Sequence, residues 1–139
     1  MRYFFLLFML GSLSGFAQQN DGITLKGNKL ILTEVPPIWP GCEAGDVNAK
    51  NSCFGENLKV HLRETFTYPK SFIPNKIKEQ MLVTFNIDVT GKAVIKNVVG
   101  GTIALQDEAI RTIAQIPLCV PAKMAGKPRE MKFTVPFAF

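Results

Sequence analysis

The spacing of apolar residues changes several times between residues 55 and 139, and each change predicts an element of secondary structure. Leu58, Leu62 and Phe66 recur every four residues with charged residues between them, which predicts a helix of about three turns. From residue 83 to residue 87 apolar and polar side chains alternate instead, which predicts a strand with one buried face. The chain therefore passes from a helix to a strand in this region.

A hairpin is predicted to follow this first strand. Gly91 lies in the polar stretch 88–92 and supplies the positive φ that tight hairpin turns need. The returning strand, residues 93–99, alternates poorly, so we expect a β-bulge in it. Two sets of inward-facing residues fit this strand equally well: Val94 with Val98, or Ile95 with Val99.

A second helix is predicted after Gly100-Gly101 and before Pro117, because apolar residues again recur at helical spacing. Asp107 and Glu108 are expected in its first turn, where the helix dipole favours negative charge. Its predicted apolar face consists of Leu105, Ala109, Ile113 and Ile116. Its predicted exposed face consists of Gln106, Arg111, Thr112 and Gln115.

The last strand is predicted over residues 131–137, after a turn at 125–128. Its inward residues are Met131, Phe133, Val135 and Phe137, and its outward residues are Lys132 and Thr134. The order helix, strand, strand, helix, strand predicts an α+β fold. We expect a three-stranded antiparallel sheet of order 2-1-3 with two helices on one face. The last strand is then an edge.

The first 54 residues divide into two segments. Residues 1–17 have a basic start, an apolar run and small residues at the end, which is typical of a cleaved signal peptide, and an uncleaved membrane anchor is the alternative. Residues 18–54 are expected to form an arm, with a short strand at 30–32 and a proline-rich stretch laid over the surface with Trp39 partly buried. The main domain is expected to span residues 55–139.

Export changes the interpretation of the cysteines and of the charge. In an oxidising compartment Cys42 and Cys53 are the natural disulfide pair across a turn-rich loop, although the sequence does not exclude a bridge to Cys119. The apolar neighbours of Cys119 favour a buried free thiol. Without Arg2 the formal net charge falls from +5 to +4, which is too mild to demand a nucleic acid as the partner.

Several motifs in this order resemble the C-terminal domain of the TonB family, over roughly residues 35–139. In the predicted hairpin and second helix they are Phe85-x-Ile87-Asp88-x-x-Gly91 and Asp107-Glu108-Ala109. After the helix they are Ile116-Pro117-x-x-x-Pro121-Ala122, and then Gly126-Lys127-Pro128 with Phe133-Thr134-Val135-Pro136-Phe137-x-Phe139. Upstream, Pro40-Gly41-Cys42-Glu43 and Cys53-Phe54 resemble the arm found in a subset of the family. Cys119 stands where the family usually has a tryptophan. A complete TonB also has an uncleaved membrane helix and a long proline-rich spacer, and this chain shows neither before its first proline cluster.

The resemblance implies a non-enzymatic periplasmic protein that binds TonB-dependent outer-membrane receptors, or another envelope protein, along its last strand. An edge strand offers unpaired backbone groups for such strand addition, or for pairing with a second copy in a homodimer. The candidate partner-binding residues are Arg129, Met131, Lys132, Phe133, Thr134 and Val135.

Enzyme chemistry finds little support in the sequence. His61 is the only histidine and lacks an acidic cluster, so neither a metal site nor a cofactor or small-molecule substrate is predicted. A thiol enzyme using Cys119 is the remaining catalytic alternative.

Overall fold

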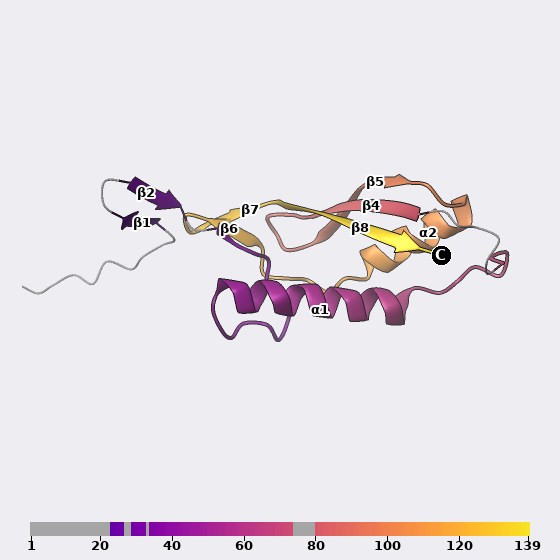
Figure 1. The fold of residues 1–139 in the computed structure, drawn as a ribbon, viewed down its shortest axis with the longest axis horizontal. Coiled ribbons are helices and arrows are strands. Elements are labelled where there is room, and N and C mark those ends of the chain that lie inside the picture. The colour runs from indigo at the N-terminus through magenta and orange to yellow at the C-terminus, as the bar shows by residue number, and fades with distance from the viewer. Residues whose placement is uncertain (1–22, 27–28, 33, 74–79) are drawn as a thin grey trace, which may run out of the picture.

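The computed structural model describes residues 23–26, 29–32, 34–73 and 80–139 (Figure 1). The predicted signal peptide, residues 1–17, lies outside the described residues. The elements are, in chain order, β1 (Ile23–Lys26), β2 (Lys29–Leu32), β3 (Glu34–Val35), α1 (Val47–Thr65), β4 (Gln80–Ile87), β5 (Ala93–Val99), α2 (Ile103–Ala114), β6 (Ala122–Met124), β7 (Lys127–Arg129) and β8 (Met131–Ala138). Neither helix is both long and apolar enough to cross a membrane, as far as the described residues extend.

The fold is α+β, and its larger sheet has the strand order β5-β4-β8 with antiparallel neighbours (Figure 1). This order corresponds to the predicted order 2-1-3. The prediction of a single sheet is wrong, however, because β3, β6 and β7 form a second three-stranded antiparallel sheet and β1 pairs with β2. The strands β6 and β7 have three residues each and mostly exposed side chains, so they carry no alternation that a sequence pattern could reveal.

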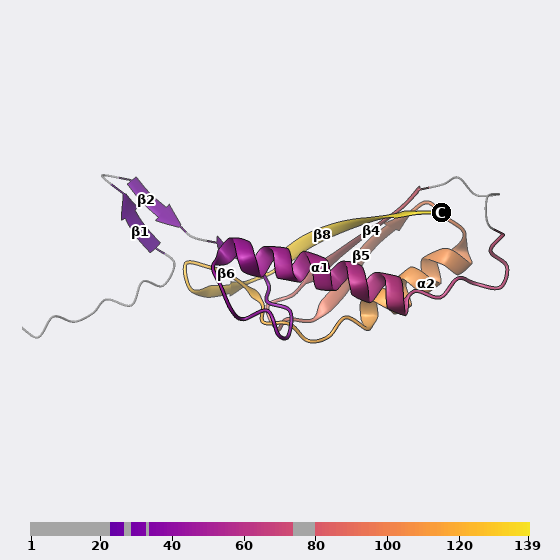
Figure 2. The same cartoon turned by 60° about the horizontal axis from the view of Figure 1, so that its bottom comes forward.

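The core lies between the β5-β4-β8 sheet and the two helices, which cover the same face of the sheet (Figures 1 and 2). The predicted alternation of β4 is confirmed, because Val83, Phe85 and Ile87 are all fully buried, and the buried Met81 extends it toward the start of the strand. Phe54 and Leu58 from α1 and Leu105, Ala109 and Ile113 from α2 meet these side chains. Burial of this apolar area is the main source of the domain's stability.

Helix α1 is longer than predicted and begins well before Gly55. Residues 47–53 form its first two turns, so the loop expected between Cys42 and Cys53 is confined to the residues before Val47. Asp46 caps the helix, since its Oδ1 atom accepts a hydrogen bond of 2.8 Å from the Ala49 N–H. The predicted apolar stripe is confirmed: Leu58 is buried and Leu62 and Phe66 pack partly buried against the core.

The proline-rich segment is part of the core and does not lie over the surface as predicted. Pro37 is fully buried and Trp39 is 8% exposed. The Trp39 ring packs edge-on against Phe54 with centroids 5.7 Å apart. Ile38 and Val120 exchange two backbone hydrogen bonds of 2.9 and 3.0 Å, which tie this segment to the chain that follows α2. Residues 34–54 therefore share one core with the described residues from 55 to 139.

The β-bulge expected in β5 is present and resolves the two alternatives. Thr84 lies opposite Asn97 and Phe85 lies opposite Ile95, so Lys96 is the additional residue. The bulge reverses the alternation, and Ile95 before it and Val98 after it both pack against the core. The hairpin turn is also as predicted, with Gly91 at φ +88° and too close to the Cys119 carbonyl for any side chain.

Helix α2 begins at Ile103, so Asp107 and Glu108 lie in its second turn and not in the first as predicted. Glu108 instead pairs with Arg111 at 2.5 Å and accepts the Thr67 N–H at 2.7 Å. Hydrogen bonds from Arg111 and Thr67 hold the pKa of Glu108 below its ordinary value. Thr112, predicted on the exposed face, is fully buried. Its hydroxyl tolerates burial because it donates a hydrogen bond of 2.8 Å to the Glu108 carbonyl.

Candidate peptide-binding edge

Strand β8 is an edge of its sheet among the described residues, with β4 as its neighbour along eight consecutive residue pairs. Its alternation is as predicted: Met131, Phe133 and Val135 are half-buried toward the helices, whereas Lys132 and Thr134 are exposed on the opposite face. The structure thus brings five of the six predicted partner-binding residues onto one strand.

Arg129, the sixth predicted residue, belongs to a different sheet. It lies on β7, opposite Ala122 of β6, and its guanidinium is 3.5 Å from a carboxylate oxygen of Glu34. Lys123 and Lys127, which surround the last strand in the sequence, also lie in the β3-β6-β7 sheet. The basic residues therefore do not form one patch along β8.

The backbone groups that β8 leaves unpaired can be identified from the hairpin between β4 and β5. The Asp88 N–H donates to the Lys92 carbonyl at 2.9 Å, so the backbone of Asp88 faces β5. Because N–H and C=O groups alternate sides along a strand, the odd-numbered residues of β4 face β8. They pair with odd-numbered residues of β8, such as Val83 with Val135. The backbone groups that face away from β4 are therefore those of Lys132, Thr134, Pro136 and Ala138.

Pro136 supports this assignment. Proline has no N–H and is found in sheets where its nitrogen faces away from the neighbouring strand. Pro136 lies opposite Leu82 within an unbroken pairing register, so its ring occupies the open side of β8. The open edge consequently offers N–H donors at Lys132, Thr134 and Ala138. Pro136, which lies between Thr134 and Ala138, offers only its carbonyl as an acceptor.

A groove of about 620 Å³ runs between this edge and α1. Its floor and walls are mainly apolar. The polar lining includes the cations of Lys59 and Arg63 and, among the described residues, no aspartate or glutamate side chain. The lining residues are Gly55, Leu58, Lys59, Leu62, Arg63, Phe66 and Tyr68 from α1 and the segment after it, and Thr134, Val135, Pro136, Phe137, Ala138 and Phe139 from β8 and the chain end beyond it.

Helix α1 and strand β8, which both line the groove, run in the same direction (Figures 1 and 2). At one end Phe54 stacks on Phe133 with ring centroids 4.9 Å apart, and at the other end Phe66 lies 5.5 Å from Phe137. A stacked aromatic pair such as Phe54 and Phe133 contributes about 0.5–1.5 kcal/mol beyond its buried area, whereas Phe66 and Phe137 meet at a tilt of 40°. The helix is therefore fixed beside the open edge at both ends of the groove.

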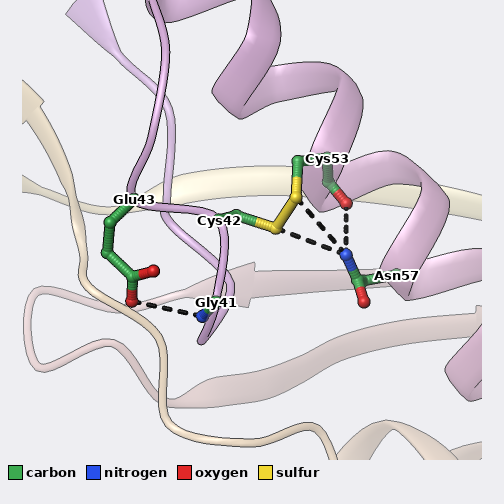
Figure 3. Close-up of a disulfide and its surroundings, with 5 residues drawn as sticks. All are labelled: Gly41, Cys42, Glu43, Cys53 and Asn57. Atoms are coloured by element: carbon green, nitrogen blue, oxygen red, sulfur yellow. Dashed lines mark hydrogen bonds between the residues drawn. A yellow bond between two sulfur atoms is a disulfide. The ribbon is translucent and has the colours of Figure 1, made fainter.

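A disulfide fixes the beginning of the helix that forms the groove wall. Cys42 and Cys53 lie at disulfide-bonding distance, with Cα atoms 5.8 Å apart, which agrees with the predicted pair (Figure 3). Figure 3 shows the Asn57 amide beside this bridge, where its Nδ2 atom donates to the Cys53 carbonyl at 2.8 Å. The Gly41 N–H donates to Glu43 Oε1 at 3.2 Å. The disulfide, together with the contact of 3.3 Å between Asn57 Nδ2 and Cys42 Sγ, joins the segment after Trp39 to the first half of α1.

The remaining chemical candidates lie inside the fold. Cys119 is a buried free thiol, as predicted, and burial raises its pKa to about 11. The thiol is therefore protonated at neutral pH, and only a thiolate attacks as a nucleophile. His61 is half-buried, with Nε2 2.8 Å from the Thr112 carbonyl, so it links α1 to α2. No group of three or more potential metal ligands occurs in the described part of the chain.

Sequence reasoning identified the apolar row that lines the groove, Leu58, Leu62 and Phe66, but missed the second row beside it. Gly55, Lys59 and Arg63 recur every four residues, which places them on one helical face. This repeat was the available signal, but it contains no apolar side chain, and a predicted helix shows its buried face through apolar residues.

The chain was compared with protein-family models, with curated proteins and with solved structures, and none of the three comparisons found a match. The TonB-like motifs therefore remain a resemblance in sequence. The function of the edge has to be inferred from its geometry.

Proposed function

We propose that this protein binds an extended segment of another envelope protein by strand addition to β8. The observation that carries the proposal is the combination of outward-facing backbone groups on β8 with an apolar groove beside them. An added strand would gain backbone hydrogen bonds from β8 and would lay alternate side chains over α1. Nothing in this mechanism requires a cofactor or a chemical reaction.

The proposed partner is the N-terminal segment of a TonB-dependent outer-membrane receptor. The resemblance of residues 35–139 to the TonB C-terminal domain supports this partner, and the export signal proposed for residues 1–17 supports a periplasmic location. Cell fractionation and N-terminal sequencing test the location, and a mature protein that begins at Gln18 and is released with the periplasm is expected.

The binding test is an NMR titration of the ¹⁵N-labelled protein with synthetic peptides covering the N-terminal segments of such receptors. We expect the largest amide shifts and the largest gain in protection from hydrogen exchange at Lys132, Thr134 and Ala138. The amides of Phe133 and Val135 already bond to β4 and should gain little protection. Shifts confined to other surfaces, or equal protection along β8, would contradict strand addition.

Pairing of β8 with a second copy is the alternative use of the same edge. A homodimer of this kind would bring two sets of the groove cations Lys59 and Arg63 toward one another, and like charges at short distance disfavour that contact. Light scattering distinguishes the two functions. A monomer at millimolar concentration excludes the dimer, whereas a dimer that receptor peptides do not dissociate would exclude the proposed partner.

A further inference from the structure

The α1 wall of the groove repeats at nearly the spacing of side chains along an extended strand. Gly55, Lys59 and Arg63 are four residues apart on one helix face, and an α-helix rises about 1.5 Å per residue, or about 6 Å per step. Side chains on one face of a strand lie two residues apart, or about 6.6 Å. A strand added to β8 therefore presents one inward side chain to each of these three positions.

The position at Gly55 is open. A Cβ atom built on Gly55 would meet no other atom within 4 Å. A glycine in a helix interior destabilises the helix relative to alanine. The missing side chain leaves room for a bulky group from a partner, next to the stacked rings of Phe54 and Phe133.

The positions at Lys59 and Arg63 are cationic. Lys59 lies 3.3 Å from Glu56, but both side chains are more than 70% exposed, so this surface ion pair is weak and exchangeable. Arg63 makes no ion pair within the described residues. Since no aspartate or glutamate side chain is among the described lining residues, carboxylates that complement Lys59 and Arg63 are left to the partner.

We propose, on the basis of the proposed function, that the groove selects an acidic partner strand of a definite pattern. The strand carries a bulky apolar side chain opposite Gly55 and carboxylates at the next two inward positions, opposite Lys59 and Arg63. Three alternate residues thus determine selectivity, and the backbone of β8 provides binding that does not depend on sequence.

The test uses four blocked heptapeptides and isothermal titration calorimetry at low ionic strength. Two carry the pattern in opposite directions, Thr-Phe-Thr-Glu-Thr-Glu-Thr and Thr-Glu-Thr-Glu-Thr-Phe-Thr, since the direction of the added strand is not fixed. The other two have lysine in place of glutamate. We expect the better glutamate peptide to bind at least 10-fold more tightly than its lysine counterpart, and salt to reduce this ratio because it screens exposed charges.

A charge reversal identifies the responsible residues. In the Lys59→Glu, Arg63→Glu double variant the preference should invert, so that the lysine peptide binds more tightly. The matched control is Lys50→Glu with Lys92→Glu, which makes the same change of net charge outside the groove lining and should keep the original preference. Loss of the preference in the control as well would assign it to net charge and overturn the proposal.

The outcomes separate this inference from the proposed function. Equal binding of glutamate and lysine peptides, with amide shifts at Lys132, Thr134 and Ala138 for both, would overturn the acidic pattern and leave strand addition intact. If none of the heptapeptides and no receptor peptide shifts these amides, both proposals fail together.

Discussion

The two edge strands of the β5-β4-β8 sheet differ in regularity and in what lies beside them. Strand β5 carries a bulge at Lys96, has an irregular pattern of burial and ends at two glycines with positive φ. Strand β8 pairs with β4 without interruption and alternates between half-buried and exposed along its whole length. A bulge is a common means of keeping an edge from pairing with another chain, and β8 has none. Each of the two strands carries an exposed lysine, Lys96 and Lys132, so the lysines do not distinguish the edges.

The difference indicates that one edge is protected and the other is available. A straight edge without a bulge is a liability in a folded protein unless it is used or covered. The β8 edge carries a single interruption, at Pro136, and it borders a groove whose wall is held in place by aromatic packing and by the disulfide. This contrast is the physical basis of the proposed function, and the following predictions test it in order of decreasing effect.

The largest effect on the free energy of unfolding is expected from Phe54, which packs α1 against β8. Phe54 is 2% exposed and contacts both Trp39 and Phe133. Phe54→Ala should lower the free energy of unfolding by about 3–5 kcal/mol, measured by urea denaturation, because it removes a large buried ring and leaves a cavity. The control on the β5 side is Val99→Ala, whose side chain is 55% exposed and should change stability by less than about 0.5 kcal/mol.

The second largest effect on stability is expected from the disulfide, which constrains α1, the helix that forms one wall of the groove. The bridge spans 11 residues in sequence. Cys42→Ser with Cys53→Ser should destabilise the protein by about 2–3 kcal/mol, because the unfolded chain regains the entropy that the loop removes. Reductant should destabilise the unmodified protein by a similar amount and leave the double variant unchanged. A loss below about 1 kcal/mol would show that packing of Trp39 alone fixes this segment.

Much of the sheet could be predicted from the sequence because its burial is periodic. Residues 83–87 and 131–137 alternate strictly, so the strands and these inward residues followed from the pattern. Met81 was not among the predicted inward residues, because the apolar Leu82 beside it interrupts the alternation. The bulge was predicted as well, since two incompatible sets of inward residues in one strand require a change of register.

The beginning of α1 was missed for a local reason. Residues 47–55 include Asn48, Asn51 and Gly55, which all have low helix propensity, and Asp46 is as common in turns as at helix N-caps. The helix forms there because Phe54 packs in the core and Cys53 is tied to Cys42, which are tertiary effects.

The groove itself was not predictable from local sequence. It exists because α1 lies beside β8, and these two elements are about 70 residues apart in the chain. The burial of Trp39 and the pairing of Arg129 with Glu34 likewise depend on which distant segments meet. Sequence patterns determine which face of an element is apolar, whereas they do not determine which second element covers it.

A proline placed on the open side of β8 tests the assigned direction of its backbone groups. Thr134→Pro removes an N–H that faces away from β4, so the pairing with β4 should persist and the thermal transition should remain cooperative. Peptide affinity should fall about 10-fold, or about 1.4 kcal/mol, measured by calorimetry. The matched control is Thr134→Val, which keeps the N–H and should bind normally. Equal affinity of both variants would place the binding site elsewhere, for example at β5.

The smallest effect is expected from a substitution of Gly55, which should change stability and peptide affinity in opposite directions. Because an added Cβ meets no atom within 4 Å, Gly55→Ala should stabilise the protein by about 0.5–1 kcal/mol, measured by urea denaturation, through lower entropy of the unfolded chain and better helix propensity. The same methyl group narrows the groove, so the phenylalanine heptapeptide should bind less tightly, whereas a version with alanine in its place should be unaffected. A variant that gains stability and loses only the bulky ligand would identify Gly55 as a residue that serves binding at the expense of the fold. Unchanged binding of both peptides would instead show that the added strand does not reach α1.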